Sequence, residues 1–146
     1  MPTTDDALTH EAKAEIVELL YRYGTSLDQR DWPMFRTIWT DDVETEYDEI
    51  GTWSGVDPFA AFMEKIHARC GESLHRITNP VVWLEEGEAR ARSYIDGIVL
   101  MASGTEAMRA VGTYEDVLRE TADGWRIARR HYRKLYMKVR PLDEAI

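Results

Sequence analysis

Three two-residue turn signals divide the second half of the chain into four extended stretches. This division constrains the fold more than any other feature of the sequence. The stretches cover about 73–84, 89–102, 107–120 and 125–139, and they are separated by Glu86-Gly87, Ser103-Gly104 and Asp123-Gly124. Dipeptides of this kind mark tight turns, and strands joined by short connections pair antiparallel. The second half is therefore predicted to form a meander of four long strands.

The first half has helical rather than strand periodicity. Between His10 and Ser26, apolar residues recur at steps of three and four, which predicts a helix with one buried stripe. Asp31 and Pro33 form a start signal for a short second helix, and Asp57-Pro58 begins a third that runs to about Cys70-Gly71. Between the second and third helices, alternating and aromatic residues from Val43 to Trp53 predict a strand.

Three helices followed by long strands predict an α+β fold, with the helices on one face of a curved sheet. The chain of 146 residues suits one domain over 1–146, because two halves would each be too small for a good core. A sheet curving around a helix can leave an apolar hollow between them. Such hollows with a few inward polar groups are typical ligand sites.

Charge argues against a nucleic-acid partner. The net charge is −9, whereas binding to phosphates requires a dense basic surface. The basic residues gather only at 126–140, where strand alternation divides them between two faces, so we expect a salt-bridged surface there. Cys70 is the only cysteine, which excludes an internal disulfide and a thiolate metal site within one chain. No signal-peptide pattern or membrane-spanning apolar run is present, so we expect a cytoplasmic protein with no membrane contact.

Three polar residues fall where apolar ones are expected. On the first long strand, the odd positions place His75 on one face with Ile77, Val81 and Trp83, the better candidate for the interior. Asp28 follows the end of the first helix's buried stripe, and Tyr23 lies five residues earlier. A carboxylate at the rim of an apolar hollow needs a partner. An imidazole would supply one, and the carboxylate would fix its tautomer.

Structural roles are the alternatives for the same residues. A lone histidine on an apolar strand face is commonly a hydrogen-bonded core residue, and Asp28 could be a cap or loop residue leading into the second helix. Tyr23 by itself is typical of a core. His10 and His67 fall on polar helix positions, so we interpret both as surface residues.

Two groups of residues carry a resemblance to SnoaL-like proteins of the nuclear transport factor 2-like superfamily. The first is Ile16 to Tyr23 with Leu27-Asp28-Gln29-Arg30-Asp31-Trp32. The second is Gly112-Thr113-Tyr114-Glu115-Asp116 with Asp123-Gly124-Trp125-Arg126-Ile127 and Arg130. The resemblance spans about 10–138. It implies a cone-shaped fold, a mixed or antiparallel sheet around the N-terminal helices, with one cavity open at the wide end.

The resemblance also implies site residues. Asp28 and His75 match the helix aspartate and strand histidine of scytalone dehydratase, hexachlorocyclohexane dehydrochlorinase and bile acid dehydratase. Tyr23 stands at the spacing of the tyrosine in the bile acid enzyme, and Tyr47 resembles the scytalone dehydratase tyrosine that hydrogen-bonds substrate. Either Arg130 or His131 would face the cavity. His131 is also the only late candidate for scytalone dehydratase's second histidine, which has no clear match.

These residues predict a cofactor-independent lyase of the dehydratase type. His75, oriented by Asp28, would move protons on a hydrophobic, polycyclic, steroid-like or terpenoid-like small molecule. No phosphate-binding glycine loop or metal-ligand cluster is present in the sequence. Besides Tyr47, Arg130 and His131, the residues expected to contact substrate are Trp39, Phe62 and Trp83.

Other functions remain open at this point. The same dyad could serve an isomerase or a polyketide-type cyclase, and the fold also hosts non-catalytic binding modules. An epoxide-opening hydrolase would need Asp28 and Arg130 together with Asp96 or Asp116. The resemblance further implies a homo-oligomer, a dimer or a trimer formed through the sheet.

Overall fold

The computed structural model describes residues 7–144, so both ends of the domain predicted over 1–146 lie outside the described residues. The fold is α+β, as predicted: three helices and a six-stranded mixed sheet that does not close into a barrel. In chain order the elements are α1 (His10–Gln29), α2 (Trp32–Arg36), β1 (Trp39–Tyr47), β2 (Gly51–Ser54), α3 (Val56–His67), β3 (Cys70–Glu85), β4 (Glu88–Met101), β5 (Glu106–Thr121), β6 (Gly124–Pro141) and a final 3-10 turn (Leu142–Glu144).

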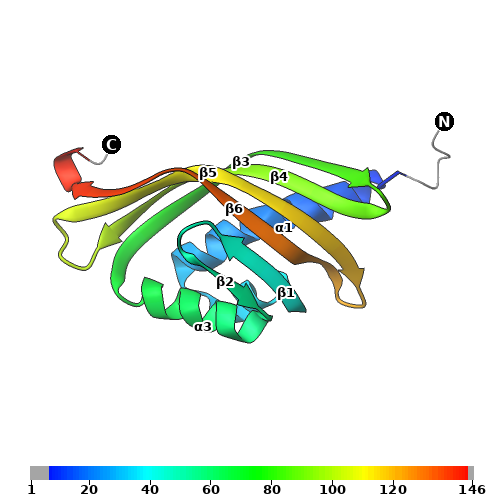
Figure 1. Cartoon of the computed structure of the whole chain (residues 1–146), viewed down its shortest axis with the longest axis horizontal. Helices are drawn as coiled ribbons and strands as arrows, with labels where there is room; N and C mark the ends of the chain where they lie inside the picture. Colours follow the sequence, from blue (N-terminus) through cyan, green and yellow to red (C-terminus); the bar gives the residue numbers. More distant parts are fainter. Residues whose placement is uncertain (1–6, 145–146) are drawn as a thin grey trace.

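The sheet has the strand order β2-β1-β6-β5-β4-β3. The predicted meander is confirmed, because β3 to β6 pair antiparallel in sequence order. The single strand predicted over Val43 to Trp53 is a hairpin instead, since the chain turns after Tyr47 and returns as β2. The other edge of β1 pairs parallel with β6, which makes the sheet mixed. Figure 1 shows the curved sheet with α1 and α3 on the same side.

Helix α1 begins where a side chain can cap it and ends later than predicted. Thr9 accepts a hydrogen bond from the Ala12 amide at the N-terminus, and Arg30 adopts a left-handed conformation at the C-terminus. The prediction ended the helix near Ser26, where the apolar periodicity stops, whereas the helix continues to Gln29. In the structure Gly24 lets α1 lie directly on β3, where a Cβ atom would come within 2.8 Å of the His75 carbonyl oxygen.

The start signals of the other two helices are confirmed. Asp31 accepts from the Met34 amide at the start of α2, with Pro33 in its first turn. Helix α3 begins at Val56, just before the Asp57-Pro58 signal. It ends at His67, slightly before the predicted end, because β3 already begins at Cys70.

A β-bulge in β3 reverses the side-chain alternation that the sequence predicted. Between the pairs Thr78–Tyr94 and Val81–Arg92 the strand carries one extra residue, and Asn79 has a positive φ of 52°. Before the bulge the odd positions face the core, as His75 and Ile77 do. After it the even positions do, so Val82 is buried and Val81 is 60% exposed. Trp83 therefore points away from the core, which corrects its predicted place on the interior face.

The core lies between the helices and the inner face of the sheet. It is unusually aromatic, with Phe35, Trp39 and Phe59 completely buried at the closed end. The edge-to-face contact between Trp39 and Phe59, with ring centroids 4.9 Å apart, adds to the burial energy of both rings. Because the side chains are tightly packed at this end, a cavity can form only toward the opposite end of the fold.

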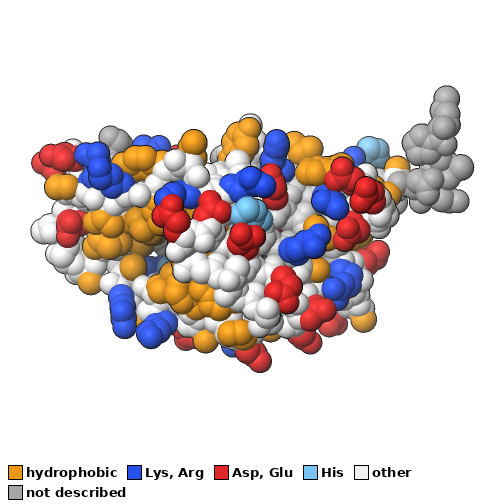
Figure 2. All heavy atoms as spheres, viewed as in Figure 1, with side chains coloured by type: hydrophobic (Ala, Val, Ile, Leu, Met, Phe, Trp, Pro, Cys, Tyr) orange, Lys and Arg blue, Asp and Glu red, His pale blue; other side chains and the backbone are white. Residues whose placement is uncertain are grey.

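Several basic residues of β6 form surface salt bridges, as predicted, whereas Arg130 is buried. Arg133 contacts Glu115 at 3.4 Å, and Lys134 contacts Glu49 at 2.7 Å. Figure 2 shows cationic and anionic side chains interspersed on one face, with no continuous basic patch there. Within residues 7–144 no helix is long and apolar enough to cross a membrane.

Candidate active site

A cavity of about 300 Å³ lies between α1, α3 and the inner face of the sheet. Its walls are largely hydrocarbon and sulfur, and the polar groups on them are tyrosine hydroxyls and two imidazoles. The side chains that line it are Tyr23, Leu27, Tyr47, Ile50, Phe62, Met63, Ile66, His67, Cys70, His75, Ile95, Val99, Met101, Met108, Ala110, Tyr114, Tyr132 and Met137. Figure 2 shows hydrophobic side chains gathered around a hollow near the turn between β4 and β5. Methionines at such a site adapt to ligand shape.

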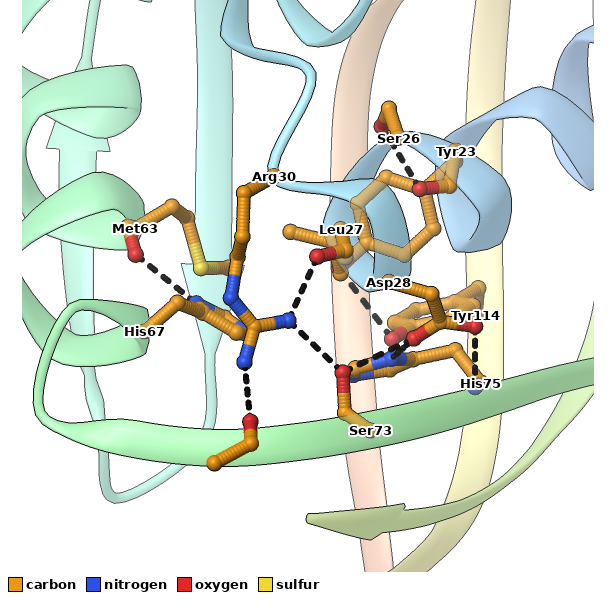
Figure 3. A network of polar contacts seen from close by, with 11 residues as sticks. Tyr23, Ser26, Leu27, Asp28, Arg30, Met63, His67, Ser73, His75 and Tyr114 are labelled. Carbon is orange, nitrogen blue, oxygen red and sulfur yellow. Dashed lines mark hydrogen bonds and ion pairs between the residues drawn. The ribbon is translucent and has the colours of Figure 1, made fainter. Parts of the chain in front are cut away.

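Asp28 and His75, chosen from the sequence as a pair, are in direct contact (Figure 3). His75 Nδ1 lies 2.6 Å from Asp28 Oδ1, and the His75 backbone amide donates to Asp28 Oδ2 at 2.9 Å. A carboxylate accepts only, so Nδ1 carries the proton and Nε2 is left as a base. The imidazole lines the cavity, and Asp28 lies behind it. The Asp28 carboxylate therefore holds the His75 imidazole in the tautomer that leaves Nε2 available as a base.

Two neighbouring side chains hold the carboxylate in place. Ser73 donates to Asp28 Oδ1 at 2.9 Å, and Arg30 donates to Ser73 Oγ at 2.8 Å. The same guanidinium donates to the carbonyls of Leu27 and Gly71, which ties the end of α1 to the start of β3 (Figure 3). Burial raises the pKa of Asp28, but hydrogen bonds from His75 and Ser73 outweigh it and hold that pKa below its usual value. Asp28 is therefore ionised at neutral pH.

Three tyrosine hydroxyls meet at the inner wall of the cavity. Tyr23 and Tyr47 share a hydrogen bond of 2.9 Å, and Tyr114 donates to Tyr23 at 3.3 Å. Burial raises the pKa of each well above its ordinary value, so all three stay protonated. Three protons shared over two hydrogen bonds leave one O–H free, on Tyr23 or Tyr47. The cluster can therefore donate to one ligand oxygen. The sequence identified Tyr23 and Tyr47 but missed Tyr114.

Arg130 faces inward, yet it lies behind the tyrosines and not on the cavity wall. It forms a buried two-point ion pair with Asp116, at 2.7 and 2.8 Å, and lies 3.9 Å from the centroid of the Tyr114 ring. Burial lowers the pKa of Arg130, but the Asp116 carboxylate more than compensates and raises it. Trp39 is also packed in the closed end, within 5.1 Å of the guanidinium. Neither residue therefore reaches the cavity, although both were predicted to contact substrate.

His131 and Trp83 point to the outer face of the sheet. Strand alternation puts His131 opposite to Arg130 and Tyr132, and its ring lies 2.9 Å from Asp48 in the β1–β2 turn. The bulge at Asn79 sends Trp83 to the same outer face. Of the residues expected on the cavity besides the dyad, the structure brings together Tyr23, Tyr47 and Phe62.

His67 is the residue most clearly missed. It was interpreted as a surface residue, whereas it is 7% exposed and lines the cavity. Its ring centroid lies 5.9 Å from that of His75 (Figure 3). A sequence signal was available, because positions 59, 63 and 67 follow one another at helical steps of four and continue the buried stripe of α3.

Two other site types find no support in the part of the chain that the structure describes. No group of three or more histidine, cysteine or acidic side chains could hold a metal ion within residues 7–144. The epoxide-opening arrangement is not assembled either. Arg130 and Asp116 pair with each other, and Asp96 pairs with Arg109 at the surface, so neither acid joins Asp28.

The structure therefore combines an open, curved α+β sheet with a histidine–aspartate pair whose imidazole lines an apolar cavity. The SnoaL-like domain model matches residues 9–131, so the chain belongs to the SnoaL-like family. An uncharacterized protein of Mycobacterium tuberculosis is 26% identical over 129 residues, which cover 87% of this chain and 88% of the relative.

Solved structures share the whole fold. A provisionally assigned aromatic ring hydroxylase from Novosphingobium aromaticivorans superposes with a TM-score of 0.82 at 25% identity, over 95% of this chain and 99% of that one. A provisionally assigned scytalone dehydratase from the same species gives 0.79 at 19% identity, over 91% and 94%. A hexachlorocyclohexane dehydrochlorinase from Novosphingobium barchaimii gives 0.78 at 19% identity, over 92% of each chain. The last two likenesses concern the fold.

Proposed function

We propose that the protein is a cofactor-independent lyase that removes water from a neutral, hydrophobic small molecule. One observation carries the proposal. The His75 ring spans from the ionised Asp28 carboxylate, 2.6 Å away, to the wall of an apolar cavity. A base in this setting can take a proton from carbon, because the nearby carboxylate stabilises the imidazolium that forms. The structural likeness to proteins named as a dehydratase and a dehydrochlorinase supports the same class of reaction.

The reaction fits a substrate in which a hydroxyl lies on the carbon β to a carbonyl. His75 Nε2 removes the proton from the α-carbon, and the electron pair moves into the carbonyl to give an enolate. As the enolate collapses, the C–O bond to the β-hydroxyl breaks, and the imidazolium returns its proton to the leaving oxygen. The products are water and a conjugated enone, and the imidazole is restored for the next cycle.

The tyrosine cluster supplies the second requirement, a donor for the enolate oxygen. The O–H that the cluster leaves free, on Tyr23 or Tyr47, can donate to an oxygen of the ligand, and the other two hydroxyls hold this donor in place. A donor placed in advance in a dry site typically lowers the barrier by several kcal/mol. In this mechanism Tyr23 takes part in the reaction as a member of the hydroxyl cluster, together with Tyr47.

The walls indicate the type of substrate. Phe62, Ile95 and Val99 offer apolar contact, and within residues 7–144 no lysine or arginine lines the cavity. A charged ligand would lose its hydration without a counter-ion. A volume of about 300 Å³ is at the small end of ligand sites. The compact members of the polycyclic or terpenoid class therefore fit best.

The test uses the aldol adduct of acetone and benzaldehyde, a neutral β-hydroxy ketone whose dehydration to benzalacetone is followed by ultraviolet absorbance. We expect His75→Ala and Asp28→Asn to lower kcat/KM by about 10²- to 10⁴-fold, the usual contribution of a positioned general base. His131→Ala is the matched control, because His131 pairs with Asp48 at 2.9 Å on the outer face of the sheet. Its activity should equal that of the wild type.

Mass spectrometry separates the remaining candidates. Loss of water supports the lyase, and a product of unchanged mass that still depends on His75 would replace it with an isomerase or cyclase. Equal activity in the wild type and both dyad variants would contradict any role for the dyad. Binding of the adduct without turnover would favour a non-catalytic binding module.

A further inference from the structure

We propose that His67 is a second ligand-contacting residue, which accepts a hydrogen bond from a hydroxyl that the ligand keeps through the reaction. Describing the ligand as a substrate rests on the proposed function, whereas the contact with His67 does not. His67 lies in the last turn of α3, is 7% exposed, and lines the cavity within 5.9 Å of the His75 ring, measured between centroids. The dyad mechanism leaves this imidazole without a role.

The backbone fixes the tautomer of His67. Its Nδ1 lies 2.7 Å from the carbonyl oxygen of Met63, one turn earlier in α3 (Figure 3). A carbonyl oxygen can only accept, so Nδ1 must carry the hydrogen. The other nitrogen, Nε2, is then an acceptor, and no side chain or backbone group of residues 7–144 forms a hydrogen bond to it. This nitrogen is therefore free to accept a hydrogen bond from a ligand in the cavity that His67 lines.

The surroundings keep His67 uncharged. Burial lowers its pKa to about 4, and the nearby His75 and Arg30 act in the same direction, against the Met63 carbonyl and Asp28. Trp32 closes one side of the ring, at a centroid distance of 5.9 Å. At neutral pH the residue therefore offers a neutral acceptor in a largely apolar wall. It neither donates to a carbonyl oxygen nor attracts an anion.

The two imidazoles consequently make different demands on a ligand. Nε2 of His75 faces the carbon that loses a proton, whereas Nε2 of His67 requires an O–H or N–H donor a short distance away. The substrate class becomes a neutral ring compound with a hydroxyl in addition to the groups that react. One neutral hydrogen bond of this kind favours a ligand with the hydroxyl modestly over the analogue without it.

Binding, rather than turnover, tests the contact. The ligands are β-naphthol, its methyl ether and naphthalene, which differ in the presence of an O–H donor. Titrations by tryptophan fluorescence at pH 7.5 give three dissociation constants for each protein. We expect the wild type to bind β-naphthol about three- to tenfold more tightly than the other two ligands, as one neutral hydrogen bond allows. His67→Phe should bind all three alike, and His67→Gln, which keeps an acceptor, should recover part of the preference.

Two further variants separate His67 from the dyad. His10→Gln is a control at an exposed position of α1 and should retain the full preference. His75→Phe removes the other imidazole acceptor of the cavity. Survival of the preference for β-naphthol in His67→Phe would show that the proposal for His67 is wrong, and loss of that preference in His75→Phe would show that the hydroxyl binds to the dyad instead. A correct preference pattern in a protein that dehydrates no β-hydroxy ketone would instead remove the lyase proposal and leave the contact standing.

Discussion

Two histidines on the wall of the same cavity have different hydrogen-bond partners. The Nδ1 of His75 lies 2.6 Å from the Asp28 carboxylate, which orients the ring. His67 has only a carbonyl partner at 2.7 Å, and its burial favours the neutral form. The identity of the partner atom therefore assigns base chemistry to one ring and acceptor chemistry to the other. Residue type and exposure alone would not distinguish them.

The low pKa of His67 makes it a source of acid sensitivity. Its pKa is about 4 in the folded protein and 6.5 when unperturbed, so between these values the unfolded state binds more protons. Stability is full above pH 6.5 and falls as the pH decreases towards 4. The linked loss is about 2 to 3 kcal/mol between pH 7.5 and 4.5. Urea unfolding should show that His67→Phe loses less stability over this range than the wild type.

The comparison is made between slopes, so a lower overall stability of His67→Phe does not affect it. Asp28, whose pKa is lowered in the fold, contributes an acid-dependent loss to both proteins. Parallel curves for the two proteins would show that His67 keeps an ordinary pKa, and the neutral-acceptor argument would lose its basis.

At the scale of elements, the joint between α1 and β3 sets the geometry of the dyad. Asp28 comes from the end of the helix and His75 from the strand, and Gly24 lets the two backbones approach. A Cβ on Gly24 would lie 2.8 Å from the His75 carbonyl oxygen and 3.3 Å from Ile77 Cγ1. The nearer contact is backbone, which cannot rotate away as a flexible side chain can.

Gly24→Ala is therefore expected to damage the site through the strand that carries it. Alanine favours a helix over glycine by about 1 kcal/mol, but overpacking against β3 costs about 1 to 3 kcal/mol. We expect a small net loss of stability in urea unfolding and a larger loss of kcat/KM on the aldol adduct, about tenfold or more, because small displacements of catalytic groups are costly. Thr25→Ala, at the exposed neighbouring position, is the control. Full activity in Gly24→Ala would show that the strand accommodates the methyl group without moving His75.

The whole molecule keeps its charges apart from its cavity. The ion pairs of β6 lie at the surface or, for Arg130 and Asp116, in the core behind the tyrosines. The cavity wall retains neutral polar groups and the imidazole of His75, which is already paired with Asp28. The net charge of −9 adds a general repulsion of anions.

The protein should consequently prefer neutral ligands to anions of the same shape. At pH 7.5, β-acetonaphthone should bind at least about a hundredfold more tightly than β-naphthoate, because an unpaired carboxylate pays several kcal/mol of desolvation. Fluorescence titration of both compounds checks this, with the methyl ester of β-naphthoate as the control for size. Comparable affinity for the carboxylate would indicate a cationic group on the wall and would exclude the neutral substrate class.

Much of this organisation follows from local sequence signals. Turn dipeptides predict the meander, and apolar periodicity and caps predict all three helices, because these effects act over a few neighbouring residues. Asp28, His75, Tyr23 and Tyr47 were identified by pattern and family resemblance. The structure places His75, Tyr23 and Tyr47 on one cavity wall, with Asp28 behind His75. The catalytic roles of these residues remain predictions until the variants are measured.

Only the tertiary structure decided which side chains reach that cavity. The positive φ of Asn79 shifts the register of β3, and the shift places Trp83 on the outer face. Asp116 draws Arg130 into the core behind the tyrosines, and Met63 holds His67 on the wall. The first two outcomes depend on a single backbone angle and on a partner in the neighbouring strand, whereas the buried stripe of α3 already indicated the place of His67. Periodicity determines the face of an ideal element, whereas the pairing of real elements determines what each face contacts.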